Sequence, residues 1–335
     1  DFCLSRGLGD VYKRQVLTLT LCTFVFNTSE FIPIGLLTDI GRDFGRTEAE
    51  MGWLVTTYAW VVALMSLPLM LLASKMECRR LMMSVLALFV ASHVLSAVAS
   101  NYWILLASRL GVACSHAIFW SVVSPLAVEV APKHKTSAAL GLVVAGSSIA
   151  MIAGLPLGRV LGLYLGWRMT FLAIGLVAAI ALVCLWRFFP SVHSRNAVAL
   201  DKVPALLSRP ALMGIYILTP LIMTGNFTVY SYIEPFLAQV TGMLPDRITW
   251  VLVAYGAVGI LGSWIFSHFF DRRPIGFLQF SVFGIVASLF LMAPLGGGEL
   301  TIVLLCIFWG LAVTLYNLVF QSAIIPVSYT HLTLP

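Results

Sequence analysis

Glu30 carries the chemistry that is hardest to explain, because it lies inside an apolar segment that runs from about residue 16 to residue 38. That segment is long enough to cross a bilayer, and Glu30 would lie about 13 Å from its outer end. A carboxylate at that depth costs at least about 2.5 kcal/mol unless it is paired, neutralised or wetted. Such residues usually mark an ion or proton pathway.

Two polar helical faces could serve such a pathway. Glu30 shares its face with Thr20, Thr23 and Asn27, and the segment 104–128 carries Arg109, His116 and Trp120 on one face. Arg109 would lie about 10 Å below the outer surface, close to the depth of Glu30. Opposite charges at matched depth predict an ion pair or a proton-sensitive partnership. A static salt bridge that only fixes helix packing is the alternative.

The two intramembrane histidines differ in their surroundings. His116 shares a face with Arg109 and Trp120, so contact with solute or protons and a structural hydrogen bond are equally open. His93 has only serines nearby in its segment, and we expect it to be structural.

Two later segments carry groups that suit polyols. Aromatic rings stack on C–H faces of a sugar, while amides and carboxylates bond its hydroxyls. Ordinary helix packing, or for Glu234 a carboxylate that reaches surface water, is the alternative. The residues are Asn226, Tyr230 and Glu234, followed by Pro235, and then Trp309, Tyr316, Asn317 and Gln321.

Composition predicts an all-α polytopic membrane protein. Hydrophobic residues make up 60% of the chain and charged residues 10%, against about 25% charged in soluble domains. Backbone that faces lipid must be helical here. We expect ten spans, at about 16–38, 51–73, 81–99, 104–128, 137–162, 169–189, 211–240, 249–269, 276–295 and 300–325.

The longest polar stretch, 190–210, divides these spans into six and four. We expect an N-terminal six-helix bundle at 16–189, a cytoplasmic central loop at 190–210, and the first four helices of a second bundle at 211–325. Residues 1–15 and 326–335 resemble translated sequencing-adaptor sequence and are left out of the fold prediction. We expect the natural protein to continue past residue 325 with two further spans.

Basic residues predict the orientation. Eleven fall on one side and four on the other, which predicts a cytoplasmic N-terminus. The eleven are Lys75, Arg79, Arg80, Lys133, Lys135, Arg187, Arg195, Lys202, Arg209, Arg272 and Arg273, and the four are Arg42, Arg46, Arg168 and Arg247.

Several function classes lack their signatures. The six cysteines form no C-x-x-C pair or metal-ligand cluster, and no phosphate loop or nucleophile triad occurs. We therefore expect no enzyme, no metal, no cofactor and no ATP-driven pump. The net charge of +6 is interpreted from the loops that carry it. It does not indicate nucleic-acid binding. The expected partners are the lipid bilayer and a small solute, with the chain acting as a monomer.

The segment 137–162 contains glycines at i+4 spacing, Gly154, Gly158 and Gly162, with Pro156 among them. Small residues let helices approach closely, and proline permits bending. The pattern predicts a packing surface that also takes part in gating.

Several stretches together resemble bacterial sugar efflux transporters, the arabinose and isopropyl-thiogalactoside exporter group of the major facilitator superfamily, in its drug:proton antiporter branch. The specific ones are SEFIPIGLL (29–37), SHAIFWS (115–121) and YSYIEPF (230–236), while GLPLG (154–158) and GWR (166–168) are general to the branch. The resemblance implies two six-helix bundles, a central cavity lined by spans 1, 4, 7 and 10, and alternating access in the bacterial cytoplasmic membrane. Arg109 matches the span-4 arginine of the branch.

The loop between spans 2 and 3 departs from the family pattern. Its sequence, ASKMECRR (73–80), lacks the usual glycine and aspartate. We expect an inner gate latched by other charges, namely Lys75, Glu77, Arg79 and Arg80. Asp271, Arg272 and Arg273 resemble a degenerate echo of this motif in the second half.

The sequence thus predicts a proton-coupled exporter of sugars or related small polar solutes. Glu30 would carry the proton, with Arg109 as its partner. The alternative is a multidrug/proton antiporter of the same fold, which exports amphipathic or cationic compounds. The expected solute contacts are Asn27, His116, Trp120, Asn226, Tyr230, Glu234, Trp309 and Asn317.

Overall fold

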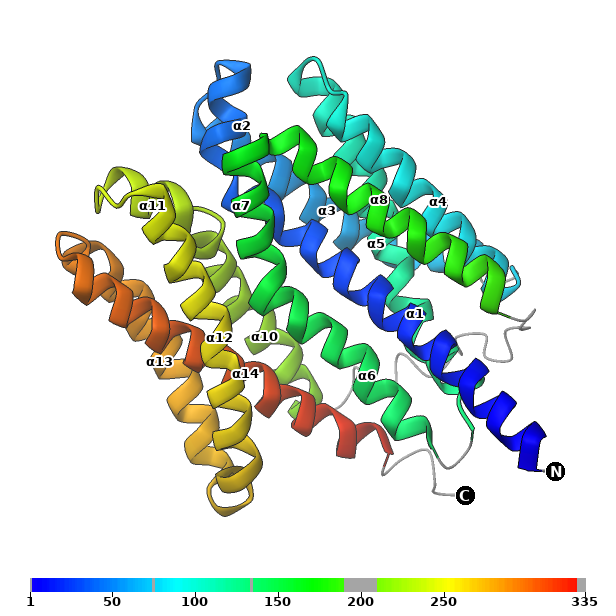
Figure 1. Cartoon of the computed structure of the whole chain (residues 1–335). Helices are drawn as coiled ribbons and strands as arrows, with labels where there is room; N and C mark the ends of the chain where they lie inside the picture. The colour runs from blue at the N-terminus through cyan, green and yellow to red at the C-terminus, as the bar shows by residue number, and fades with distance from the viewer. Residues whose placement is uncertain (1, 74–75, 133–134, 190–209, 330–335) are drawn as a thin grey trace. The chain divides into compact units, whose positions relative to one another are not determined.

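The computed structural model describes residues 2–73, 76–132, 135–189 and 210–329, and these ranges are helical without a β-strand (Figure 1). The chain divides into two compact units, residues 1–199 and 200–335, called the first and second unit below. The predicted all-α membrane fold is confirmed. By length and composition, eight helices among the described residues could cross a membrane.

The first unit contains the helices coloured blue to green in Figure 1. They are α1 (Phe2–Gly35), α2 (Leu37–Phe44), α3 (Glu48–Ala73), α4 (Cys78–Ala97), α5 (Tyr102–Val130), α6 (Thr136–Ile149), η2 (Ala150–Gly154), α7 (Leu155–Leu165) and α8 (Trp167–Phe188).

The second unit follows in yellow-green to red. Its helices are α10 (Pro210–Tyr230), α11 (Ile233–Gln239), α12 (Pro245–Phe269), η4 (Phe270–Arg272), α13 (Pro274–Leu295) and α14 (Glu299–Tyr329).

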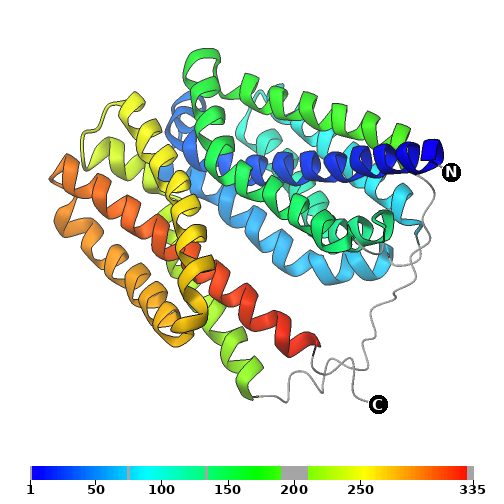
Figure 2. The same cartoon turned by 60° about the horizontal axis from the view of Figure 1, so that its bottom comes forward.

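Aromatic packing joins three helices at the core of the first unit. The ring of Phe26 on α1 lies 4.1 Å from that of Phe89 on α4 and stacks at 4.0 Å on that of Phe119 on α5. All three side chains are fully buried. Helix α8 lies beside α4, as both views show (Figures 1 and 2). This packing fixes the faces of α1, α4 and α5 that carry the candidate site.

The predicted span 137–162 is helical throughout, but it is not a regular α-helix from end to end. It consists of α6, the π turn η2 and α7. Pro156 lies near the start of α7, and it cannot donate a backbone hydrogen bond to residue 152, inside the π turn. The wider π turn therefore accommodates the missing bond.

The π turn also keeps the glycines of this span on one face. Gly154 follows Gly146 by eight positions, and in a regular α-helix this step would overshoot two turns by about 80°. A π turn absorbs the extra residue. A methyl group at Gly146, Gly154 or Gly158 would clash with α1, at Thr20, Thr28 and Ile32 respectively. The structure thus shows the close helix approach that the glycine spacing predicts.

The predicted span 211–240 is also interrupted. Helix α10 ends at Tyr230, and α11 begins at Ile233 after a turn. Pro235 explains the break, because its ring clashes with the carbonyl of the residue four positions earlier, Ser231. Glu234 consequently lies in the first turn of a short helix.

The first and last helices include residues that were left out of the fold prediction. Helix α1 begins at Phe2. Tyr12 and Gln15 are buried, and Gln15 Nε2 donates to the carbonyl of Phe188 at 2.8 Å. Helix α14 likewise continues past residue 325 to Tyr329.

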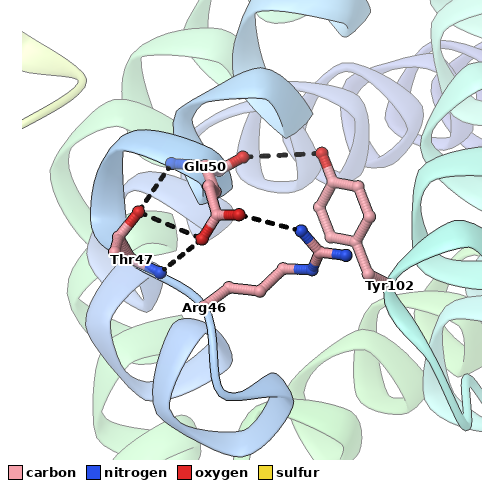
Figure 3. Close-up of polar contacts among 4 residues, drawn as sticks. All are labelled: Arg46, Thr47, Glu50 and Tyr102. Atoms are coloured by element: carbon pink, nitrogen blue, oxygen red, sulfur yellow. Dashed lines mark hydrogen bonds and ion pairs between the residues drawn. The ribbon is translucent and has the colours of Figure 1, made fainter.

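A capping box starts α3 (Figure 3). The backbone N–H of Thr47 donates to Glu50 Oε2 at 2.9 Å, and the N–H of Glu50 donates to the Thr47 hydroxyl at 3.3 Å. Arg46 pairs with Glu50 at 3.0 Å, and the hydroxyl of Tyr102 donates to the carbonyl of Glu50 at 3.5 Å. These contacts tie the start of α3 to the start of α5.

Candidate functional site

Glu30 and His116 meet inside the first unit. Glu30 Oε2 on α1 lies 3.6 Å from His116 Nε2 on α5, and 30% of the glutamate side chain is exposed against 5% for the histidine. One turn further along α5, Trp120 Nε1 donates to the same histidine nitrogen at 2.6 Å. Because that nitrogen accepts, the imidazole is neutral with its proton on Nδ1. The structure therefore brings together three of the predicted residues.

Arg109 does not form the predicted ion pair with Glu30, although both residues are among those described. Its guanidinium donates instead to Ser29, to the hydroxyl at 3.4 Å and to the carbonyl at 3.3 Å. Ser29 and Glu30 are neighbours in α1, and successive side chains of a helix point about 100° apart. Arg109 meets the serine direction, while the carboxylate points toward His116.

Ser29 links Arg109 to His93. Its hydroxyl lies 2.8 Å from His93 Nε2, and His93 Nδ1 lies 2.9 Å from the carbonyl of Phe89. Since a carbonyl only accepts, Nδ1 donates, and Nε2 must accept from the serine. The serine oxygen is then free to accept from Arg109. His93 thus has the hydrogen-bonded environment expected of a structural histidine, while Ser29 was missed because it lies off the polar stripe of its helix.

Two aromatic rings surround the guanidinium of Arg109. Its central carbon lies 4.9 Å from the ring centre of Tyr58 on α3 and 6.0 Å from that of Phe171 on α8. The Tyr58 ring also meets the His116 ring at 5.7 Å, almost edge-on at 79°. Tyr58 was missed because its segment carries no charged residue and no polar stripe.

Asn27 uses its amide group in helix packing. Its Nδ2 donates to the carbonyl of Thr23 at 3.2 Å and to the hydroxyl of Ser147 on α6 at 2.8 Å. Thr23 donates to the carbonyl of Val143 at 3.1 Å. The lower part of the predicted polar stripe therefore holds α1 against α6.

The second unit brings Asn226, Tyr230 and Trp309 together. Trp309 Nε1 on α14 donates to Asn226 Oδ1 on α10 at 2.9 Å, and both side chains are buried. The Tyr230 ring lies 6.0 Å from the Trp309 ring, and Tyr255 of α12 lies 5.2 Å and 5.1 Å from these two rings. Tyr255 was not predicted. Glu234 is buried, and Asn317 is half-buried on α14.

Three predicted gating charges of the first unit are described, and each contacts another residue of that unit. Glu77 pairs with Arg80 at 3.2 Å, and Arg79 donates to the carbonyl of Trp186 on α8 at 2.6 Å. Lys75 lies outside the described residues, as does the side chain of Asp271. In the second unit Arg272 lies 5.9 Å from the ring centre of Phe269.

Comparison with known proteins matches residues 19–329 to the family model of the Major Facilitator Superfamily. Two curated relatives, each named "Probable sugar efflux transporter", come from Helicobacter pylori strains G27 and HPAG1. Each is 44% identical over 311 residues, which cover 93% of this chain and 80% of the relative.

Two solved structures show the same fold. They are a bacterial homolog of the human lysosomal transporter Spinster in inward-facing conformations, unoccupied and occupied, each with a TM-score of 0.69. Identities are 16% and 17%, with 94% and 92% of this chain and 74% and 73% of those chains covered. The family match spans nearly the whole chain and agrees with the helical fold described above. The chain is therefore a multi-pass membrane protein that belongs to the major facilitator superfamily.

Proposed function

We propose that the protein exports sugars or related small polar solutes in exchange for protons, by alternating access. It acts as a monomer in a bacterial cytoplasmic membrane, with its N-terminus in the cytoplasm. The family membership and the printed names of the relatives support the transport class. The polar groups inside the first unit support the coupling to protons.

The carboxylate of Glu30 is the observation that carries this proposal. It is partly exposed, it forms no direct ion pair with Arg109, and the neutral His116 lies 3.6 Å away. An ionised carboxylate in that state has acceptor sites open for the hydroxyls of a solute. A proton that binds one of these oxygens removes the negative charge and turns that oxygen into a donor, which weakens the carboxyl group as an acceptor. Proton and solute thus compete for one group, which is what an antiporter requires.

Each further residue has a role in this scheme. Trp120 donates to His116 and keeps it neutral, so the histidine places no positive charge beside Glu30. In the second unit Asn226, Tyr230 and Glu234 would contact the solute. Trp309 holds Asn226 in place, Asn317 adds a polar group on the same helix, and Asn27 holds α1 against α6 beside the site.

We assign gating to two sets of residues. Gly154, Pro156 and Gly158 flank the end of the π turn and would permit span 5 to bend against α1. The charged loop residues would latch the cytoplasmic side, namely Lys75, Glu77, Arg79, Arg80, Asp271 and Arg272.

Replacing the carboxylate tests the coupling. We expect Glu30→Gln to abolish solute-driven proton movement in inverted membrane vesicles, measured with a pH-sensitive dye, while the protein still accumulates in the membrane. Glu299→Gln is the matched control, because Glu299 forms an exposed ion pair with Arg247, and it should transport normally. Undiminished proton movement in the Glu30 variant would sink the proposal.

A multidrug antiporter is the second candidate, favoured by one observation. The rings of Tyr230, Tyr255 and Trp309 gather in the unit that also buries Glu234, and aromatic rings with a carboxylate suit organic cations. Vesicle assays with arabinose and isopropyl-thiogalactoside, against cationic dyes, separate the two. Proton movement that only dyes elicit would favour the multidrug function.

A further inference from the structure

We propose that Tyr58 is a positioning residue whose ring holds Arg109 away from Glu30 and so keeps the carboxylate open. This inference deepens the proposed function and rests on it. It concerns how the cation nearest the site is kept from neutralising the group that binds protons and solute.

Tyr58 is more buried than most large side chains of its helix. Helix α3 exposes large apolar side chains, among them Trp53, Trp60 and Leu64. Tyr58 is one of its few buried residues, with 4% of its surface exposed. A tyrosine turned inward from a helix whose other large side chains are mostly exposed indicates a contact that this position serves.

That contact is with the two partners of the site. The Tyr58 ring lies 4.9 Å from the guanidinium carbon of Arg109 and 5.7 Å from the His116 ring. The hydrogen bonds from Arg109 to Ser29 are long, at 3.3 and 3.4 Å. A ring face attracts a desolvated cation by about 2 kcal/mol or more. The ring is therefore a substantial part of what holds Arg109 in this orientation.

The hydroxyl of Tyr58 has no hydrogen-bond partner among the described residues. A buried, unpartnered hydroxyl adds nothing to the position of Arg109, so the aromatic ring is the working part. Phenylalanine should replace tyrosine at this position, whereas an aliphatic side chain should not.

Loss of the ring changes the balance of charges around Glu30. The ionisable groups near Arg109 are Glu30 on α1, His93 on α4 and His116 on α5, and α8 contributes the uncharged Phe171. Both histidines have their Nε2 atoms occupied as acceptors. Glu30 is thus the one anion in this group, and a released guanidinium would move toward it.

Carbodiimide labelling tests this without any transport. The reagent modifies protonated carboxyl groups in membranes, and fragmentation of the labelled peptide in the mass spectrometer distinguishes Glu30 from Asp39. We expect Tyr58→Leu and Tyr58→Met to lower the pH at which half of Glu30 is labelled by about one unit, because an adjacent cation favours the carboxylate. Tyr58→Phe should leave this midpoint unchanged. Methionine fills the space flexibly, so it serves if the leucine variant does not accumulate.

Two outcomes would overturn the inference. One is an unchanged midpoint in the Leu and Met variants, and the other is a Tyr58→Phe variant that shifts as they do, which would assign the role to the hydroxyl. Transport assays with isopropyl-thiogalactoside on the same vesicles keep the two ideas apart. Absent solute-driven proton movement in the unmodified protein would count against the proposed function, while the labelling comparison would still decide the role of Tyr58.

Discussion

Ser29 and Thr28 are neighbours in α1, but only one of their two buried hydroxyl groups is hydrogen-bonded. Ser29 accepts from Arg109 and contacts His93, so it serves α5 and α4 at once. The hydroxyl of Thr28 is also buried but has no partner among the described residues. Because desolvation is costly only for groups left without partners, these neighbours should respond very differently to replacement.

We expect Ser29→Ala to destabilise the protein by about 1–3 kcal/mol, since it leaves Nε2 of His93 buried without a partner. Unfolding in mixed detergent micelles, followed by circular dichroism, measures the change. Thr28→Val is the matched control, because it removes a hydroxyl while keeping the shape of the side chain, and it should be neutral or slightly stabilising. Equal losses in the two variants would contradict the network.

The sequence predicted the residues on polar stripes and missed those outside them. Glu30 and His116 were found because each is costly in a membrane, and Trp120 was found because helical spacing places it on the face of His116. Ser29 and Tyr58 show no such signal, because a serine is common in spans and a tyrosine on an apolar segment reads as packing. The missing information is rotational, namely which side of α1 faces α5. Without it, the sequence could not show that Arg109 contacts Ser29 directly and not Glu30.

At the scale of helices, the prolines and glycines indicated where a helix could bend or pack closely. They did not predict the helix break or the π turn that the structure contains. Pro235 indicated a loosened helix, and α10 ends just before it. Thr47 and Glu50 fit the capping-box spacing, which the sequence carried unnoticed. The π turn of span 5 had no sequence signature beyond Pro156, because its position depends on packing against α1.

Two glycines of α6 separate packing from intrinsic helix propensity. A methyl group at Gly146 would clash with the backbone carbonyl of Thr20, while one at Gly141 would meet nothing within 4 Å. We expect Gly146→Ala to cost about 1–3 kcal/mol through forced separation of α6 from α1.

Gly141→Ala, in the same helix, should stabilise by up to about 1 kcal/mol, because alanine is the better helix former. The same micelle unfolding experiment compares them. The contact is disproved if both alanine variants gain stability.

At the scale of the whole molecule, the distribution of basic residues predicts the orientation of the chain in the membrane. The eleven-to-four distribution predicts which helix ends face the cytoplasm. The loop between α5 and α6 should be inside, and the loop between α4 and α5 should be outside.

Reporter insertion tests this orientation. We expect alkaline phosphatase to be active when inserted at residues 98–101 and inactive at 131–132, because the enzyme matures only outside the cytoplasm. Green fluorescent protein at the same two sites should show the reverse pattern. Phosphatase activity at 131–132 without activity at 98–101 would contradict the predicted orientation. It would mean that Lys133 and Lys135 lie outside.

The π turn of span 5 also bears on which changes of chain length this helix can accept. A deletion elsewhere in a packed span rotates all later residues by about 100° and turns them off their partners. Loss of one residue within 150–153 would place the glycine now at 154 seven positions after Gly146. Seven residues of regular α-helix amount to about two turns, so both glycines would still face α1. This segment is therefore the place where the span can shorten by one residue and keep its packing.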